Sequence, residues 1–367
     1  MIERNHILVT GGAGFIGANF TKMALSQGYQ VTVLDKLTYS GCAGSLKELN
    51  NNPMFNFLQV GIQDQKEILY FLNNLGCGEY LSAVVHFAAE THVDRSIDSP
   101  EIFFETNVLG TQKLISTLMK SKSLKDNFRF LHVSTDEVFG SADSHDFDEA
   151  SPYHPNSPYA ASKAGADHLV RAAFKTYKFP VIITNCSNNY GPFQFPEKLI
   201  PLVIIKALGE APLPIYGDGG QIRDWLYVDD HCSAILVALK GGTPGDTYLL
   251  GDGNPITNLT VVEKTCDILD QMRPRSSGQQ YRNLITFVTD RPGHDRRYAI
   301  NAEKFRTKFG WTAKTNFDEG LRKTVIWYLQ NQKWWDAILA KSYSLERLGL
   351  SNSVQPNNSG QAPTKAR

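Results

Sequence analysis

The chain carries no excess charge of either sign. Its 367 residues include 37 Lys+Arg and 37 Asp+Glu, so the formal net charge is zero. Proteins that bind nucleic acids or other polyanions usually have a basic excess. The composition therefore gives no indication of a nucleic-acid partner and leaves only local patches open.

The chain is also poor in cysteine and has no long apolar run. Its five cysteines are odd in number, scattered, and never spaced as Cys-x-x-Cys, which argues against a disulfide framework or a zinc site. The nine histidines show no His-x-x-x-His spacing, so we predict no metal. No stretch of about 18 apolar residues or signal-peptide layout is present. We therefore expect a cytoplasmic protein without a membrane partner.

Short apolar segments alternate with longer amphipathic ones through the first half of the chain. "HILVT", "QVTVLD", "SAVVHFAA", "FRFLHVST" and "PVIITN" read as strands, and residues 19–28, 103–121 and 160–177 suit helices. The strands are too uniformly apolar for a sheet that exposes one face to solvent. The pattern predicts an α/β fold with a doubly wound parallel sheet of the Rossmann type.

The composition changes after about residue 185, where Pro and Gly become frequent. We predict an NAD-binding domain over residues 1–185 and a smaller, loop-rich substrate lobe mainly over residues 186–350. Residues 223–250 again read as strand then helix and are expected to rejoin the first domain. Residues 351–367 contain one Val as their only large apolar residue, so we expect a disordered tail.

A glycine pattern follows the first predicted strand. Gly11, Gly14 and Gly17 lie between that strand and a helix, and Asp35 ends the next strand. Small residues let the backbone approach a pyrophosphate at a helix N-terminus, and a carboxylate at that strand end can accept both ribose hydroxyls. Glycines alone more often serve turns or packing, but this arrangement favours a dinucleotide. The carboxylate favours NAD, whereas neighbouring Lys36 would suit NADP.

Tyr159 and Lys163, in "SPYAASKAG", lie four residues apart and thus on one helical face. An ammonium beside a phenol lowers the pKa of the phenol towards neutrality, which suits a base that takes a proton from an alcohol. The pair alone is common on helix surfaces. Together with the glycine loop, it points to an oxidation by NAD.

Two adjacent carboxyl groups, Asp136 and Glu137, follow the strand in "FLHVSTDEVFGS". A solvated loop would explain them without any function. Two carboxyl groups in a partly desolvated cleft, however, need not ionise together, because burial and like charge raise one of the two pKa values. Such a pair can supply one acid and one base at neutral pH.

These residues together resemble the extended short-chain dehydrogenase/reductase superfamily. Within it, "STDEVFG", "YAASK", "NNYGPFQFPEKLIP", "IRDWLYV" and "DRPGHDRRYAI" resemble the dTDP-glucose 4,6-dehydratase family, and the likeness runs from about His6 to Trp327. The resemblance implies a hydro-lyase acting on dTDP-glucose in deoxysugar biosynthesis. It also implies a homodimer with a four-helix interface over residues 103–121 and 160–177.

The same resemblance implies a role for each catalytic residue. Tyr159, assisted by Lys163, receives the proton of the hydroxyl on carbon 4 while NAD takes the hydride. Glu137 then removes the acidified proton on carbon 5, and Asp136 protonates the departing hydroxyl on carbon 6. The hydride returns to carbon 6, and Thr135 holds the hydroxyl on carbon 4.

The remaining binding residues are implied by the resemblance as well. The cofactor side is expected to comprise the glycine loop, Tyr159, Lys163, and Phe15, Ile16, Asp35, Lys36, Ile62, Thr106 and Asn189. The nucleotide-sugar side is expected to comprise Thr91, Thr135, Asn188, Lys198, Leu199, Pro214, Tyr216, Arg223, Asn258, Arg291 and His294. Arg223 suits a bidentate diphosphate clamp. The other interpretation of Arg223 is a structural salt bridge with Asp224 or Asp229.

The chain departs from the family pattern in "QVGIQD", where Gly61 stands in place of the acid expected to hold the adenine amino group. Ile62 and Asp64 remain. We predict NAD that is held more weakly or exchanged more readily.

Two other functions fit parts of the pattern. A nucleotide-sugar 4-epimerase would use the glycine loop and the Tyr/Lys pair and leave Asp136 and Glu137 idle. A non-catalytic NAD-binding sensor or scaffold would need only the glycine loop and Asp35. The sequence does not separate thymine from uracil as the base.

Overall fold

A seven-stranded parallel sheet forms the centre of the protein. The computed structural model describes residues 5–76, 79–142, 145–341, 343 and 345. The strand order is β10-β6-β5-β4-β1-β2-β3, and every pairing is parallel. The strands are β1 (His6–Thr10), β2 (Gln30–Leu34), β3 (Phe55–Leu58), β4 (Leu81–His86), β5 (Leu124–Thr135), β6 (Val181–Cys186) and β10 (Thr247–Leu250). The predicted Rossmann-type sheet is confirmed.

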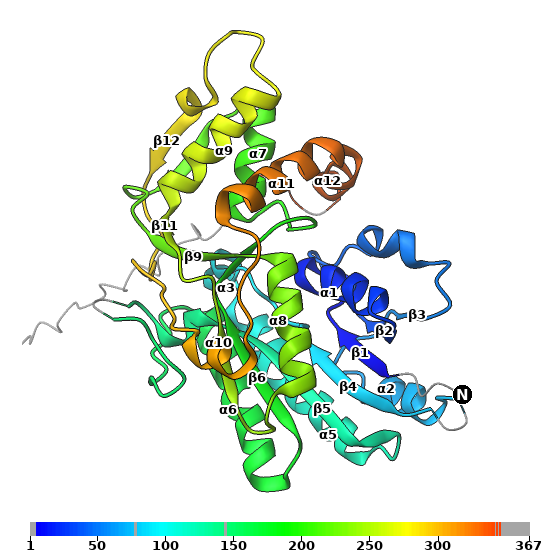
Figure 1. Ribbon diagram of the computed structural model, residues 1–367. Helices are drawn as coiled ribbons and strands as arrows, with labels where there is room; N and C mark the ends of the chain where they lie inside the picture. Colours follow the sequence, from blue (N-terminus) through cyan, green and yellow to red (C-terminus); the bar gives the residue numbers. More distant parts are fainter. Residues whose placement is uncertain (1–4, 77–78, 143–144, 342, 344, 346–367) are drawn as a thin grey trace, which may run out of the picture.

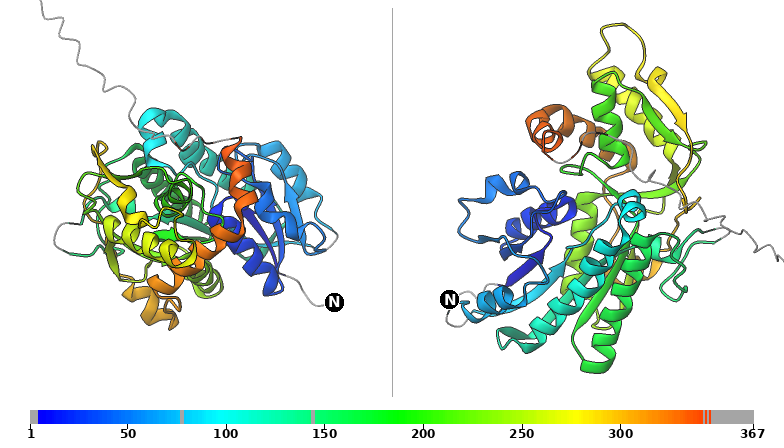
Figure 2. Two further views of the ribbon diagram at one scale, coloured as in Figure 1. Left: turned by 90° about the horizontal axis from the view of Figure 1, so that it is seen from above. Right: turned by 180° about the vertical axis from the view of Figure 1, so that it is seen from behind.

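Helices cover both faces of this sheet (Figure 1). α1 (Phe15–Ser26) and α8 (Val228–Gly241) pack on one face, against Ile7, Val9 and Val33 among others. The opposite face carries α2 (Gln65–Asn73), α5 (Thr111–Lys120) and α6 (Pro158–Tyr177), whose apolar side chains meet Leu8 and Leu34. α5 and α6 lie side by side when the molecule is seen from behind (Figure 2). Because successive strand residues point to opposite faces, a strand covered on both sides is apolar throughout.

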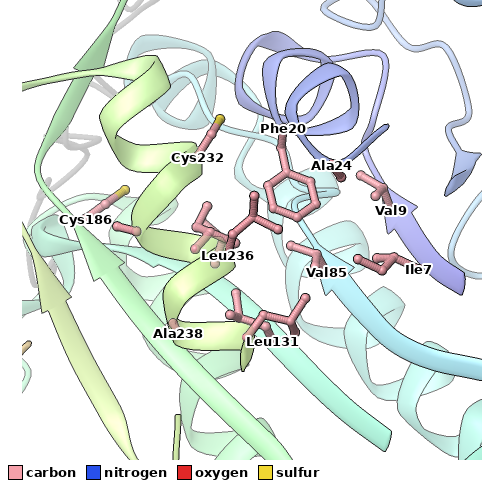
Figure 3. Close-up of a cluster of buried hydrophobic side chains, with 14 of the residues drawn as sticks. Ile7, Val9, Phe20, Ala24, Val85, Leu131, Cys186, Cys232, Leu236 and Ala238 are labelled. Carbon is pink, nitrogen blue, oxygen red and sulfur yellow. The ribbon is translucent and has the colours of Figure 1, made fainter. Parts of the chain in front are cut away.

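The core between α1, α8 and the sheet is closely packed. Phe20 of α1 and Leu236 of α8 meet Val85 of β4 and Leu131 of β5 (Figure 3). All four side chains are at most 2% exposed. Each buried side chain of this size contributes roughly 1.5–3 kcal/mol to stability. This packing fixes α1, and thus the glycine loop before it, against the carboxyl ends of the strands.

The segment before α5 is irregular. It comprises α3 (Val93–Asp98), α4 (Pro100–Phe103) and a π-helical stretch, η2 (Phe104–Gly110). The sequence predicted one helix over residues 103–121. The structure divides it into η2 and α5, and π-helical turns of this kind frequently occur at functional sites. Here the stretch carries Thr106, which lines the cavity described below.

A second lobe rises above the carboxyl ends of the strands (Figure 1). Its core is formed by residues of α7 (Leu199–Leu208), α9 (Asn258–Met272), α11 (Phe317–Gln330) and α12 (Gln332–Leu339). Two small sheets complete it, one of β7 (Asn188–Tyr190), β9 (Ile222–Tyr227) and β11 (Pro255–Thr257), and one of β8 (Leu213–Tyr216) and β12 (Ile285–Val288). These helices are more regular than the Pro and Gly content suggested.

The chain returns from the second lobe to the large sheet. α8 packs on the sheet and β10 pairs with β6, whereas β9, at residues 222–227, belongs to the three-stranded sheet. α10 (Glu303–Phe309) then packs beside β10. The division of the chain into two domains stays a prediction, and the predicted tail, residues 351–367, lies outside the described residues. Within the described ranges, no helix combines the length and apolar character needed to cross a membrane.

Candidate active site

Two cavities meet at the carboxyl ends of the parallel strands. The first has a volume of about 300 Å³ and is lined by every residue predicted to bind the cofactor, together with Thr135, Asp136 and Glu137. The second, of about 230 Å³, reaches into the second lobe. The residues that line both are Thr91, Glu137, Asn188, Glu197 and Lys198. The strand order reverses between β1 and β4, and ligands of open α/β sheets bind at such a point.

The glycine loop leaves room for a ligand backbone at the start of α1. Gly11 has φ +69°, and a Cβ added there would lie 2.6 Å from the backbone nitrogen of Ala88. A Cβ added at Gly17 would lie 2.3 Å from the carbonyl oxygen of Gly11. α1 begins after its N-cap residue, Gly14, which has no side chain that could accept the first N–H groups of the helix. Its first backbone N–H groups thus border the cavity, as binding of a pyrophosphate requires.

Asp35 lies beside this loop, at the end of β2. Its Oδ2 accepts the N–H of Ala13 at 2.9 Å, and its Oδ1 accepts the N–H of Leu37 at 2.8 Å. Burial raises the pKa of Asp35, and these two hydrogen bonds oppose that rise. Each carboxylate oxygen can accept a further hydrogen bond, so the group fits the two hydroxyls of a ribose.

The wall of the first cavity near Gly61 has no carboxylate where the family pattern places one. The N–H of Gly61 donates to Asp64 Oδ2 at 2.9 Å, so the Asp64 carboxylate is turned back on the loop. Asp64 is absent from the lining of the cavity, whereas Ile62 and Gln63 are part of it. Ile62 packs on Gly110 of η2. No carboxylate therefore borders this end of the cavity at position 61 or 64.

Tyr159 and Lys163 lie in the first turns of α6, whose N-cap Ser157 accepts the N–H of Ala160. Both side chains are buried and line the first cavity. Lys163 Nζ donates to the carbonyl oxygen of Val133 at 2.9 Å. Burial raises the pKa of Tyr159 well above its ordinary value, and nearby Glu137 adds to the rise. The pKa of Tyr159 is thus raised rather than lowered in this structure, and the expectation that Lys163 brings it towards neutrality stays a prediction.

The adjacent carboxyl groups occupy a short 3₁₀ turn, η3 (Asp136–Phe139), that begins where β5 ends. Thr135 caps the turn, because its Oγ1 accepts the N–H of Glu137 at 3.3 Å. Thr135 Oγ1 also donates to Asp136 Oδ1 at 3.4 Å, whereas Asp136 Oδ2 is buried without a partner among the described residues. Asp136 and Glu137 therefore lie on the same turn, but only Glu137 also lines the second cavity.

Burial and neighbouring charges give the two carboxyl groups different acidities. Burial raises the pKa of Asp136 well above its ordinary value, and the charge of Glu137 raises it further. Burial also raises the pKa of Glu137, but Arg291, Arg223 and Lys198 oppose that rise. At neutral pH this arrangement favours a protonated Asp136 beside an ionised Glu137.

Positively charged groups border the second cavity. The guanidinium of Arg223 donates to the carbonyl oxygens of Ile222 and Asp295 at 2.8 and 3.0 Å and stacks 4.0 Å from the centre of the Tyr298 ring. No ion pair links it to Asp224 or Asp229 in the described part of the chain, so the salt-bridge interpretation is wrong. Lys198 Nζ donates to the carbonyl oxygen of Thr91 at 3.1 Å.

The other predicted substrate residues line the same cavity, apart from Thr135, which lines the first one. Arg291 pairs with Asp94 at 2.5 Å, and Tyr216 donates to the second oxygen of Asp94 at 2.9 Å. Burial lowers the pKa of His294 to about 4, so the ring is neutral near pH 7. Leu199 and Pro214 form apolar parts of the cavity wall. Asn188 and Asn258 also line it, and their side-chain oxygens have no hydrogen-bond partner among the described residues.

Sequence reasoning missed three residues of the site. Glu197 lines both cavities and accepts hydrogen bonds from Arg95 and Tyr39 at 2.8 and 3.2 Å. Tyr298 has its hydroxyl 2.8 Å from Asp295 and 3.4 Å from Glu137, and Asp94 holds Arg291. Glu197 and Tyr298 stand inside the motifs "FPEKLIP" and "DRRYAI" that carried the resemblance. No spacing rule distinguishes Glu197 and Tyr298 from the neighbouring residues of these motifs, so the sequence gives no separate signal for either.

Known proteins resemble this chain along most of its length. A model of the family described as GDP-mannose 4,6 dehydratase matches residues 8–324. A dTDP-glucose 4,6-dehydratase from Xanthomonas campestris pv. campestris (strain B100) is 51% identical over 350 residues, which cover 94% of this chain and 99% of the relative. The chain belongs to the dTDP-glucose 4,6-dehydratase family. This confirms the family resemblance found in the motifs.

Solved structures of dTDP-glucose 4,6-dehydratases have the same fold. The enzyme DesIV from Streptomyces venezuelae, solved with NAD bound, has a TM-score of 0.82 and 42% identity and covers 91% of this chain and 99% of its own. The one from Bacillus anthracis str. Ames, in complex with NAD, has a TM-score of 0.80 and 43% identity over 91% and 99%. A UDP-glucose 4-epimerase from Thermus thermophilus has a TM-score of 0.77 but 27% identity over 89% and 99%. The fold is common to dehydratases and epimerases, so the side chains of the site must distinguish them.

Proposed function

We propose that this chain is an NAD-dependent hydro-lyase that converts dTDP-glucose into dTDP-4-dehydro-6-deoxy-glucose. The observation that carries the proposal is the unequal carboxyl pair, Asp136 and Glu137, at the junction of the two cavities. An epimerase on this fold has no use for such a pair. The sequence identity to dTDP-glucose 4,6-dehydratases supports the same choice.

The first cavity has the groups that a dinucleotide needs. The glycine loop and the start of α1 would hold the pyrophosphate, Asp35 the ribose hydroxyls, and Ile62 the adenine face. When bound, NAD supplies a hydride acceptor for carbon 4, a hydride donor for carbon 6, and a nicotinamide cation whose charge lowers the pKa of Tyr159. NAD is also present in the solved structures of related dehydratases.

Tyr159 is the base for the first step. Its hydroxyl oxygen, as the phenolate, receives the proton of the hydroxyl on carbon 4 when that carbon is oxidised to a ketone. Thr135 would hold this hydroxyl, since its Oγ1 lies at the end of β5 beside the same cavity. Lys163 supports the phenolate with its positive charge.

Glu137 and Asp136 carry out the elimination. The ketone acidifies the proton on carbon 5, and the Glu137 carboxylate, kept ionised by Arg291, Arg223 and Lys198, removes it. The protonated Asp136 gives its proton to the hydroxyl on carbon 6, which departs as water. As carbon 6 takes the hydride back, protonated Glu137 would return its proton to carbon 5, which completes the 4-keto-6-deoxy sugar. The proton that Tyr159 keeps from the hydroxyl on carbon 4 balances the one that Asp136 has lost to the departing water.

The second cavity would hold the nucleotide diphosphate. Arg223 is a buried cation, Arg291 has 16% of its side chain exposed, and both line this cavity. Guanidinium groups bind diphosphates through paired hydrogen bonds. Asn188 and Asn258 present side-chain oxygens without partners among the described residues, which suits hydroxyl and imide donors of the ligand.

A homodimer remains part of the proposal, and so does a cytoplasmic location. Large apolar side chains are exposed along the segment from α4 to α5 and on α6, where the four-helix interface is expected: Ile102, Phe104, Leu109, Met119 and Tyr177. Exposed apolar side chains gathered on one face are typical of an interface.

Deuterium transfer tests the reaction. The protein is incubated with dTDP-glucose that carries deuterium at carbon 4, and the product is examined by NMR. Deuterium in a new methyl group supports the dehydratase. Deuterium returned to carbon 4 with inverted configuration would identify an epimerase, and unchanged substrate would leave only a binding protein.

A further inference from the structure

A buried carboxylate lies behind the catalytic residues and has no part in the steps above. Asp167 follows Lys163 by one turn of α6, and its side chain is 0% exposed. Three groups donate hydrogen bonds to its Oδ2: Ser134 Oγ at 2.9 Å, the Tyr153 hydroxyl at 2.8 Å and Asn185 Nδ2 at 3.2 Å. A buried carboxylate is very unfavourable unless it is paired, so this number of donors indicates that the ionised form is retained.

The groups around Asp167 come from several elements. His132 of β5 has Nε2 3.2 Å from Asp167 Oδ1. Arg171 of α6 donates to the Tyr153 hydroxyl at 2.7 Å. Burial raises the pKa of Asp167, but the contact with His132, the charge of Lys163 and the Tyr153 hydroxyl outweigh it, so the pKa lies below its ordinary value.

Lys163 is a buried cation whose charged form is disfavoured by burial. Its ammonium is buried and donates to a neutral partner, the carbonyl oxygen of Val133. Burial lowers the pKa of Lys163, and Asp167 is the first group that opposes this, followed by Cys186 of β6. His86 of β4 and His132 are buried as well, and their lowered pKa values keep both rings neutral, so neither competes as a cation.

Hydrogen bonds also connect the Asp167 carboxylate to β5, the strand that leads to Asp136 and Glu137. Val133 accepts from Lys163, Ser134 donates to Asp167, and Asn185 joins Asp167 to the carbonyl oxygen of Thr135 at 3.0 Å. Three consecutive residues of β5 are thus tied to one side of α6. The next residues along the chain are the acid and the base of the elimination.

We propose that Asp167 is a positioning residue, which holds Lys163 as an ammonium beside Tyr159 and fixes the end of β5 through Ser134 and Asn185. This inference rests on the proposed function, because it assigns Lys163 the task of supporting the Tyr159 phenolate. A purely structural Asp167 would affect folding and the maximal rate but not the pH at which Lys163 loses its proton.

The variant Asp167→Asn tests the charge, because it keeps the shape and removes the anion. NADH formation from dTDP-glucose is followed in a single turnover across the pH range, with NAD binding and circular dichroism as checks of folding. We expect the alkaline limb of the rate to move to lower pH by about one unit or more, the size typical of losing a neighbouring opposite charge. A folded Asp167→Asn variant whose alkaline limb coincides with that of the wild type would overturn the proposal.

The matched control is Tyr153→Phe, which removes one hydrogen bond to Asp167 and leaves its charge. We expect its alkaline limb to stay at the wild-type position, and a shift as large as that of Asp167→Asn would show that hydrogen bonding rather than charge is responsible. Should Asp167→Asn fail to fold, the side-chain nitrogen of Lys163 is titrated by NMR in the wild-type protein with NAD. A nitrogen that is an ammonium at neutral pH supports the proposal, and a neutral amine at neutral pH overturns it. This titration needs no turnover, so it stays informative even where the proposed function fails.

Discussion

Replacing Glu137 by Gln should separate oxidation from elimination. The Glu137 side chain lines both cavities, and Arg291, Arg223 and Lys198 oppose the rise in its pKa that burial causes. The amide of Gln has nearly the same size but accepts no proton from carbon 5. A positioned base contributes about 10²–10⁴-fold to a rate, so the variant should lose roughly 3–5 kcal/mol of transition-state stabilisation in the elimination.

Oxidation at carbon 4 does not use this carboxylate. In a single turnover, we therefore expect NADH to form at close to the wild-type rate and then to persist, because no alkene is available to take the hydride back. NADH absorbance and the yield of 4-keto-6-deoxy sugar are measured on the same samples. Glu137→Asp is the control, since it keeps a carboxylate on a shorter chain and should retain part of the elimination. Normal product from Glu137→Gln at the wild-type rate would refute the assignment of the base.

Three further changes test other parts of the site. Tyr159→Phe should slow NADH formation in a single turnover by about 10²-fold or more, and NADH formed at an unchanged rate would assign the base elsewhere. Asp136→Asn should gain unfolding free energy relative to the wild type as the pH rises from about 5 to about 8, measured by denaturant titration. Asp136 has a raised pKa in the folded state, so the stability that it contributes at low pH is lost as the pH rises through that pKa, whereas Asn contributes no such slope. Gly61→Asp should retain more NAD through purification than the wild type, with Gly61→Ala as the control, because it supplies a carboxylate at the adenine end once Asp64 releases the Gly61 N–H. Wild-type protein that is already saturated with NAD would contradict this reasoning.

The large sheet could be predicted because each of its strands is recognisable from a few consecutive residues. Each strand is a short run of apolar residues, and the alternation of "HILVT" and "QVTVLD" with amphipathic helices admits few topologies. The glycine loop and Asp35 follow from the same order of elements. The positions at the carboxyl ends of the strands were therefore available from the sequence alone.

The second lobe could not be predicted in the same detail. α7 is nearly uniformly apolar in "LIPLVIIKAL" and follows a segment rich in Pro and Gly, so periodicity gives little indication of a helix there. The π-helical stretch η2 has no signal in the sequence either. Its residues pack against α6, and tertiary contacts of this kind determine local geometry where propensity is weak.

The acidity of Tyr159 shows a second limit of sequence reasoning. A spacing of four residues places Lys163 on the same face of the helix, but it does not reveal how deeply both groups are buried. Desolvation raises the pKa of the phenol and lowers that of the ammonium, and it is the largest influence on both. Only the residues that surround the pair, Asp167 among them, decide which protonation states are retained.

The unequal roles of Asp136 and Glu137 follow from the direction of the chain more than from their mutual repulsion. Desolvation is the largest influence on both pKa values, so burial alone does not distinguish the two. The next neighbours do, because Asp136 meets the carboxylates of Glu137 and Asp224 and a single cation, Arg223. Glu137 meets three cations, Arg291, Arg223 and Lys198. Consecutive residues on a 3₁₀ turn point in different directions, and here one direction leads into the protein and the other towards the cavity junction. An acid and a base can therefore be adjacent in the sequence, provided that more cations of the second lobe act on one of them than on the other.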